Sequence, residues 1–208
     1  MQVVFDHVLV AVNDLAEAAA DFRNRYGLES AEGGRHTGLG TANRIIPLGD
    51  AYIELIAVAD HEEAAGSALG RWVTDMCSDG DRPAAVCLRT QDIESTARII
   101  GSPVVAMQRV RPDGVVLSWR LCGLETTLAD PALPFFIQWD VEADDLPGAL
   151  PEGHPNQNIE LAWVEVAAGE DAIRARVGAE GPDIRCVEAG TGLVAIGLST
   201  PDGPTVIR

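Results

Sequence analysis

The stretch GGRHTGLGTANRIIPLGDAYIEL, residues 33–55, contains a histidine, an Asn-Arg pair, a cluster of glycines and one acidic residue inside an apolar run. That acidic residue is Glu54, within YIELIAV (52–58), whose aliphatic, aromatic and β-branched residues are typical of a buried strand. A buried carboxylate is costly unless something pairs with it. We therefore expect Glu54 to meet a metal, an arginine or a ligand. The alternative is an outward position on a half-exposed strand, since strand side chains alternate between faces.

The composition limits the classes of partner. With 208 residues, of which 47% are hydrophobic, the chain can bury a sizeable core. Its 32 acidic and 15 basic residues give a formal net charge of −17. Such a field repels nucleic acids and anionic membranes, so we expect neither as a partner.

We expect neither a targeting segment nor a redox role for the cysteines. No window approaches the ~18 uninterrupted apolar residues of a membrane span, and the first five residues enter a strand-like run with no basic segment before it. We therefore expect a cytoplasmic protein. The four cysteines lie far apart without C-x-x-C spacing and are expected to be reduced thiols.

Residues 5–58 predict a βαβββ unit. A helix capped by Asp14 should end near Gly27. A glycine-rich loop is expected to carry His36 between the second and third strands. The predicted strands cover residues 5–12, part of 28–32, 41–48 and 51–58.

The same pattern returns after Pro83. AAVCLRTQDI (84–93) aligns without a gap on residues 6–15, which places Asp92 over the capping Asp14. The repeat closes with Phe136-Ile137-Gln138 over Tyr52-Ile53-Glu54. Between these ends we expect a helix over 93–100 and strands over 104–110 and 115–121, joined by a turn at 112–114. The internal repeat predicts a domain over residues 1–140 with modules at 4–60 and 82–140. After a linker over 142–155, a third, smaller βαβββ-like unit is expected at 156–208.

Repeated βαβββ units with a histidine in the first strand and a glutamate in the last resemble the vicinal oxygen chelate (VOC) superfamily, which includes glyoxalase I, extradiol dioxygenases and bleomycin-type resistance proteins. More narrowly, the chain is similar to glyoxalase-like domain proteins. The similarity rests on the strings DH (6–7), GGRH (33–36), GTANR (40–44) and YIEL (52–55). The resemblance covers residues 4 to about 140. It implies an α+β fold in which tandem βαβββ modules form a cupped mixed β-sheet with helices outside.

In that superfamily a divalent metal lies inside the cup on one residue from the first and one from the last strand of each module. By this resemblance the slots are His7 and Glu54 in the first module, and Ala85 and Gln138 in the second. Alanine cannot bind a metal. A zinc, iron, manganese or nickel ion on His7, Glu54 and Gln138 would therefore need a further ligand, for which His36 is placed.

Other polar residues have both a functional and a structural interpretation. His36 and Asn43 could bind substrate or support the loop, and Arg44 could bind substrate or form an ion pair with Glu54. Gln138 could hydrogen-bond a ligand, and Trp119 could line the same pocket or belong to the core. The glycine spacing does not match a nucleotide-binding loop, so no nucleotide cofactor is expected.

We predict that His7, His36, Asn43, Glu54 and Gln138 converge in the cup. Glu54 would be the catalytic base or metal carboxylate and His7 its catalytic partner, in a lyase, isomerase or dioxygenase acting on a small oxygenated substrate. A non-catalytic protein that binds an antibiotic or toxin is the alternative. The third unit should either pack on the other two or pair with its twin in a homodimer, since exposed sheet edges are usually covered.

Overall fold

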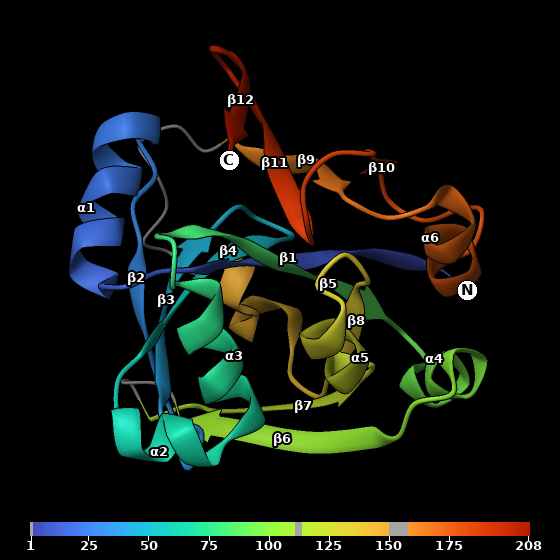
Figure 1. Ribbon diagram of the computed structural model, residues 1–208, viewed down its shortest axis with the longest axis horizontal. Coiled ribbons are helices and arrows are strands. Elements are labelled where there is room, and N and C mark those ends of the chain that lie inside the picture. Colours follow the sequence, from blue (N-terminus) through green and yellow to red (C-terminus); the bar gives the residue numbers. More distant parts are fainter. Residues whose placement is uncertain (1, 111–113, 150–157) are drawn as a thin grey trace.

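The computed structural model describes residues 2–110, 114–149 and 158–208, and two βαβββ units follow one another in it (Figure 1). The turn predicted at 112–114 and the linker predicted at 142–155 lie partly outside these residues. The first unit consists of β1 (Val3–Ala11), α1 (Leu15–Tyr26), β2 (Ala31–His36), β3 (Thr41–Pro47) and β4 (Tyr52–Val58). The second consists of β5 (Arg82–Thr90), α4 (Ile93–Ile100), β6 (Val104–Val110), β7 (Val116–Cys122) and β8 (Phe135–Trp139).

The helix ends repeat as the sequence predicts. Asp14 accepts hydrogen bonds from the backbone of α1, and Asp92 accepts one from Ser95 at the start of α4. Each helix ends at a glycine in the left-handed conformation, Gly27 with φ 69° and Gly101 with φ 67°. Glycine adopts this conformation without the penalty that a Cβ imposes.

Both units share one eight-stranded mixed sheet in the order β2-β3-β4-β1-β5-β8-β7-β6. β1 and β5 pair antiparallel at its centre, and each pairs parallel with the last strand of its own unit. The sheet curls until its two edge strands approach each other, and Arg109 on β6 donates a hydrogen bond to the carbonyl of Gly33 on β2. The predicted cup is confirmed.

Helices cover both faces of the curled sheet. α1 and α4 pack on the outer face, where Phe22 and Ile93 join the core. The helices α2 (His61–Gly66), α3 (Ala68–Met76) and α5 (Leu124–Ala129) belong to connections, and α5 was not predicted. α3 contacts α5, and both contribute side chains to the inside of the cup.

The GGRH segment was expected in a loop but forms most of β2, and only residues 37–40 turn. The prediction failed because two adjacent glycines were taken as loop residues. In the structure they let another strand and a side chain approach β2 closely, which is a usual role of glycine in strands.

The C-terminal unit forms a separate sheet. It consists of β9 (Glu160–Val166), α6 (Glu170–Val177), β10 (Ile184–Cys186), β11 (Leu193–Thr200) and β12 (Gly203–Ile207). Its strand order is β10-β9-β11-β12, so β9 pairs parallel with the strand directly after its helix, whereas β1 pairs parallel with the last strand of its unit. The element order repeats, but the strand topology does not.

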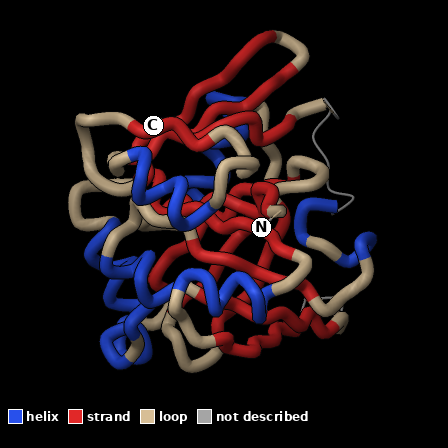
Figure 2. The backbone as a smooth tube through the Cα atoms, turned by 90° about the vertical axis from the view of Figure 1, so that its right-hand side faces the viewer, coloured by secondary structure: helices blue, strands red, loops and turns tan. Residues whose placement is uncertain are grey.

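The C-terminal sheet packs on the outer face of the main sheet, as two views show (Figures 1 and 2). Val164 and Ile196 share one core with Val86, Leu88 and Phe136. Short 3-10 helices at Ala143–Asp145 and Pro147–Ala149 lie between the sheets in sequence. The division into separate domains after residue 140 stays a prediction.

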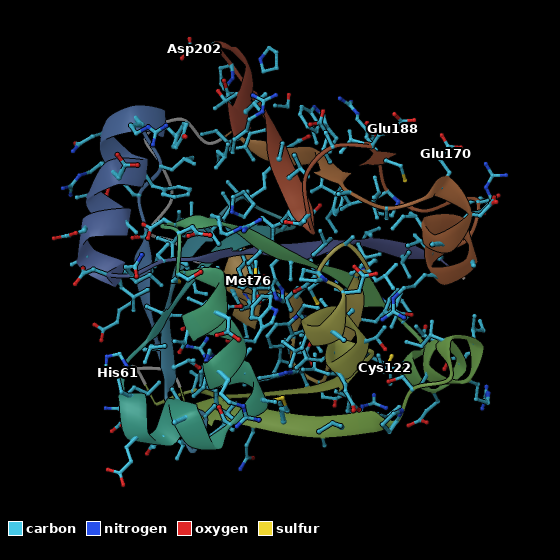
Figure 3. All side chains as sticks on the ribbon, in the orientation of Figure 1. His61, Met76, Cys122, Glu170, Glu188 and Asp202 are labelled. Atoms are coloured by element: carbon cyan, nitrogen blue, oxygen red, sulfur yellow. The ribbon has the colours of Figure 1, made fainter. Side chains whose placement is uncertain are left out.

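Many charges lie at the molecular surface. His61, Glu170, Glu188 and Asp202 are exposed and point outward (Figure 3). All four cysteines are free, as predicted. Among the described residues, no helix is long and apolar enough to span a membrane.

The turn after β2 depends on Gly40, which has φ +70° and lies against α2. A Cβ there would stand 2.1 Å from the backbone N of Ala64, which cannot rotate away. We expect Gly40→Ala to lower the free energy of unfolding by about 3 kcal/mol or more, from crowding added to the left-handed penalty. Gly38 has φ +75°, but an added Cβ would have nothing within 4 Å of it, so Gly38→Ala should cost only about 1 kcal/mol. Urea unfolding measures both, and equal losses would contradict the crowding argument.

Candidate active site

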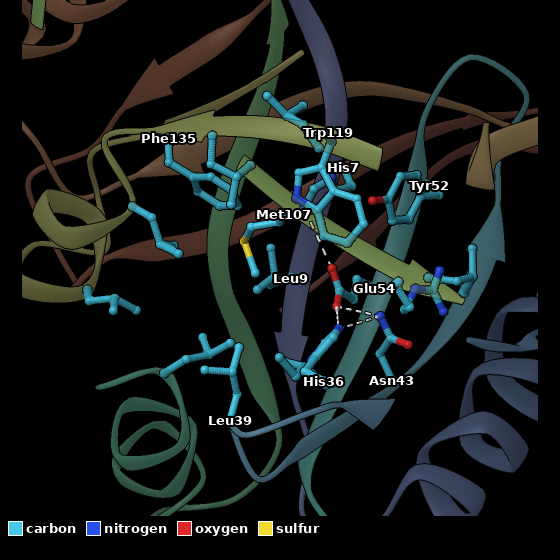
Figure 4. A pocket seen from close by; sticks show the side chains of 18 of the residues that line it. His7, Leu9, His36, Leu39, Asn43, Tyr52, Glu54, Met107, Trp119 and Phe135 are labelled. Carbon is cyan, nitrogen blue, oxygen red and sulfur yellow. Dashed lines mark hydrogen bonds and ion pairs between the residues drawn. The ribbon is translucent and has the colours of Figure 1, made fainter. Parts of the chain in front are cut away.

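A cavity of about 280 Å³ lies inside the cup, at the low end of the sizes typical of ligand pockets. One part of its wall is polar, and most of the rest is aliphatic or aromatic (Figure 4). The polar side chains are those of His7, His36, Asn43, Tyr52, Glu54 and Arg109. The apolar ones include Leu9, Leu39, Met107, Trp119, Leu121, Leu124, Phe135 and Trp139.

Glu54 is the centre of the polar wall and is 8% exposed. It reaches the cavity because β4 pairs Glu54 with Leu9 on β1 and with Ile45 on β3, and both neighbours line the same cavity. Asn43 Nδ2 donates a hydrogen bond of 2.7 Å to Glu54 Oε1. The carboxylate is thus held at one oxygen and remains open to the cavity.

Two imidazoles flank this carboxylate on different oxygens. His7 Nε2 lies 3.6 Å from Glu54 Oε2, and His36 Nε2 lies 3.8 Å from Glu54 Oε1. Figure 4 shows Glu54 between the two rings.

The hydrogen bonds of His36 fix its tautomer. Its Nε2 lies 3.3 Å from Asn43 Nδ2, which can only donate, so Nε2 must accept. The proton therefore resides on Nδ1, which donates to Thr41 Oγ1 at 2.9 Å. Burial lowers the pKa of His36, Glu54 opposes this change and Arg109 adds to it. His36 is accordingly neutral at pH 7.

His7 is held from behind by a second carboxylate. His7 Nδ1 lies 2.7 Å from Asp6 Oδ1, and Trp139 Nε1 donates to Asp6 Oδ2 at 2.9 Å. Arg89 Nη1 lies 3.8 Å from the same Oδ2. The contact with Asp6 places the proton of neutral His7 on Nδ1 and leaves Nε2 directed at Glu54. Stacking on Tyr52, with ring centroids 4.5 Å apart, fixes the plane of the His7 ring.

Gly33 makes room for Asn43. A Cβ on Gly33 would lie 2.0 Å from Asn43 Oδ1. Within the described parts of the chain this buried Oδ1 has no hydrogen-bond partner, because Nδ2 is the atom turned toward Glu54 and His36. Gly33 and Asn43 of the sequence motif are thus complementary parts of one contact.

Four of the five residues expected to converge, His7, His36, Asn43 and Glu54, line this cavity, and so does Trp119, whose ring lies 5.3 Å from that of Trp139. Their roles stay predictions.

The placement expected for Gln138 is wrong. Val8 pairs with Val86 at the centre of the repeat, and the parallel pairs Leu9–Glu54 and Cys87–Phe135 make Phe135 the structural counterpart of Glu54. Gln138 is three residues further along, which places it on the other face of the strand. There its Oε1 accepts a hydrogen bond from the backbone N of Ile93 at the start of α4.

Arg44 also lies on the outer side of the sheet. Its neighbours Asn43 and Ile45 line the cavity, whereas its own guanidinium donates to the side chain and carbonyl of Ser30 at 2.9 Å each. Arg44 does not line the cavity where a substrate contact was expected, and its guanidinium binds Ser30 and not Glu54. The reason is strand alternation, which sends the residue beside Asn43 to the opposite face.

Four residues of the site were not predicted from the sequence: Asp6, Tyr52, Trp139 and Arg109. Asp6 was visible in the Asp-His string but received no role. Tyr52 stands two residues before Glu54 on the same strand, and alternation places it on the same face. Burial raises the pKa of Tyr52 well above its usual value, so its phenol stays protonated. Arg109 carried no signal, because only closure of the sheet brings it to the site.

The donor set does not suit the divalent metal that the superfamily resemblance implies. The second module offers only Ala85 and Phe135 at the equivalent slots. In the first module, Asn43 Nδ2 already donates to Glu54 Oε1 and to His36 Nε2, the atoms that would have to face a metal. Over the described residues, His7, His36 and Glu54 also do not form a group whose donor atoms all lie within 4.8 Å of one another.

A second group of possible ligands lies behind His7. In the described residues, Asp6, His7 and Cys87 are the three such side chains whose donor atoms lie within 4.8 Å of one another. Both oxygens of Asp6 already accept hydrogen bonds. Burial raises the pKa of Cys87 well above its usual value, so the thiol stays protonated. This group is better described as a hydrogen-bonded support for His7.

Comparison with known proteins agrees with the fold. Residues 5–180 match the family described as "Glyoxalase-like domain". A hypothetical protein from Staphylococcus aureus has a TM-score of 0.70 at 18% identity, covering 92% of this chain and 88% of its own. A methylmalonyl-CoA epimerase in complex with methylmalonyl-CoA and NH4+ has a TM-score of 0.50 at 18% identity, covering 68% of this chain and 97% of its own. No protein of curated function matches the sequence. At such identities the structural matches show the fold alone.

Proposed function

Since the chain belongs to the glyoxalase-like domain family, within the VOC superfamily, we propose that it is an isomerase- or lyase-type enzyme in which Glu54 is the general base. The substrate is a small oxygenated molecule that carries a hydrogen on the carbon next to a carbonyl group. The observation that carries the proposal is the buried Glu54 carboxylate, which faces the cavity between two imidazoles.

The support for acid–base work is geometric. Glu54 Oε2 carries no direct hydrogen bond among the described residues and lies 3.6 Å from His7 Nε2, so it can take a proton from a bound carbon acid and pass it to His7. Asp6, 2.7 Å from Nδ1, would stabilise the imidazolium that forms. The protonated phenol of Tyr52 lines the cavity and can donate to the substrate oxygen on which negative charge develops.

The alternative function is ligand binding without turnover. The large apolar wall would serve a binding protein equally well. A buried carboxylate, however, costs free energy that simple apolar binding does not require. A role in proton transfer would account for the buried carboxylate.

The test is proton exchange in D₂O. Purified protein is treated with a chelator, its metal content is measured by mass spectrometry, and small aldehydes, ketones and 2-oxo acids are followed by ¹H NMR. We expect deuterium to enter at the carbon next to the carbonyl at a rate well above that of buffer, and to do so in metal-free protein. Exchange that stops with the chelator and returns with zinc or manganese would overturn the metal-independent mechanism. Binding of these compounds without exchange would make the protein a binding protein.

A further inference from the structure

We propose that the cavity selects small organic acids, and that Arg109 binds their carboxylate. This inference rests on the proposed function only in that it uses the same cavity. It adds the chemical class of the substrate and a residue that determines specificity.

Arg109 reaches the site across the seam where the sheet closes. It belongs to β6, while Gly33, whose carbonyl accepts a hydrogen bond from Arg109 Nη1, belongs to β2. The absent side chain of Gly34 gives the guanidinium room, because a Cβ there would stand 3.2 Å from Nη1. The contact with Gly33 uses one of five N–H donors, and the planar group is suited to bind a carboxylate through two of the others.

The charge of Arg109 is not neutralised inside the cavity. Over the residues that the structure describes, no ion pair joins Arg109 to a carboxylate, Glu54 included. His36, its neighbour on the polar wall, is neutral. The guanidinium charge is nevertheless felt by its surroundings, since it contributes to lowering the pKa of His36 and opposes the rise at Tyr52. A guanidinium on the wall of a largely apolar cavity favours an anionic ligand.

A short series of contacts through Asn43 and Gly33 connects Glu54 to Arg109. Asn43 donates to Glu54, its Oδ1 packs against Gly33, and the carbonyl of Gly33 accepts from Arg109. An acid whose carboxylate binds Arg109 therefore has its next carbon atoms beside the proposed base. The positive charge of the guanidinium offsets the repulsion between the ligand carboxylate and Glu54.

The apolar wall and the volume of the cavity indicate the polarity and the size of the rest of the ligand. One wall of the cavity is apolar and is formed by Leu9, Leu121 and Phe135. A purely polar ligand would leave this wall in contact with water. A volume of about 280 Å³ corresponds to about nine water molecules in the liquid. The occupant is thus an acid with an apolar body and on the order of ten non-hydrogen atoms.

Because the whole protein is acidic, a preference for an acid over its amide would indicate a local positive charge in the cavity. A net charge of −17 repels anions from the surface. Preference for an acid over its neutral amide therefore cannot arise from non-specific attraction and must come from a local cation.

The experiment compares acids with amides of the same shape. The probes are isobutyrate, phenylacetate and 1-naphthylacetate, each with its amide, and binding is followed by the fluorescence of Trp119 and Trp139, which line the cavity. We expect at least one acid to bind about tenfold or more tightly than its amide. Arg109→Met should remove this preference by weakening the acid alone, and Arg109→Lys should retain part of it.

The outcomes separate a binding role from a structural one. If Arg109 only joined β2 to β6, Arg109→Met would weaken acid and amide alike, and the inference would be wrong. Equal affinities of the wild-type protein for acid and amide, or no acid bound at 10 mM or below, would also overturn it, and neither result depends on a variant that folds. Glu54→Gln should bind the acid at least as tightly as wild type, because one negative charge is gone. Acid binding in a protein without exchange activity would therefore contradict the proposed function and leave this inference standing.

Discussion

Replacement of Glu54 by glutamine is expected to lower the rate of proton exchange by about 10²- to 10⁴-fold, the usual contribution of a positioned general base. Glutamine has the same shape and keeps an oxygen that can accept from Asn43, which lies 2.7 Å away in the wild type. It lacks only the capacity to take up the proton. We therefore expect the free energy of unfolding to change by less than about 1 kcal/mol.

The measurement combines ¹H NMR exchange rates with urea unfolding. Glu32→Gln is a matched control, since Glu32 is an exposed carboxylate on β2 in the same module, and it should change neither quantity. A large loss of stability with exchange intact would show that Glu54 is a structural partner of the two histidines. In that case the base would have to be sought elsewhere in the cavity.

Replacement of Asp6 by asparagine should lower the exchange rate by about 10²-fold or more, although Asp6 does not line the cavity. Asp6 accepts from His7 with one oxygen and from Trp139 with the other. An amide has only one oxygen. If that oxygen keeps the bond from Trp139, the NH₂ group faces His7 Nδ1, which must then accept, and the proton moves to Nε2. Nε2 can then no longer take a proton from Glu54.

The tautomer of His7 is the readout that separates this positioning role from general damage. ¹⁵N chemical shifts of the imidazole should report Nδ1–H in the wild type and Nε2–H in Asp6→Asn. Trp139→Phe removes the other hydrogen bond to Asp6 and should leave the tautomer unchanged. An unchanged tautomer in Asp6→Asn, or an unchanged rate despite the altered tautomer, would contradict the role assigned to Asp6.

The modules could be predicted from the sequence because their signals are local. Hydrophobic alternation marks the strands, and the repeated pairs of a capping aspartate and a closing glycine mark α1 and α4. The side chains of His7, Asn43 and Glu54 share the cavity because strands of one module pair in the register that buries their apolar faces.

Residues that depend on pairing between distant segments could not be placed in this way. The register of β8 against β5 makes Phe135, and not Gln138, face the inside of the cup. The two residues are three positions apart, and such an offset places them on opposite faces of the strand. Irregular pairing of β1 with β5 between Phe5 and His7 accompanies the buried position of Asp6. Neither offset leaves a pattern in the local sequence.

The sequence by itself determined the two βαβββ modules, since periodicity, capping and turn chemistry act between residues close in the chain, and its resemblance to the VOC superfamily implied the cup and the positions of His7 and Glu54 in it. Only the tertiary structure decided the topology of the C-terminal sheet, the support of His7 by Asp6 and Trp139, and the arrival of Arg109 at Gly33. The physical reason is that these contacts form when the sheet curls and closes. They join segments up to 133 residues apart, whose relative positions depend on the twist and packing of the whole sheet.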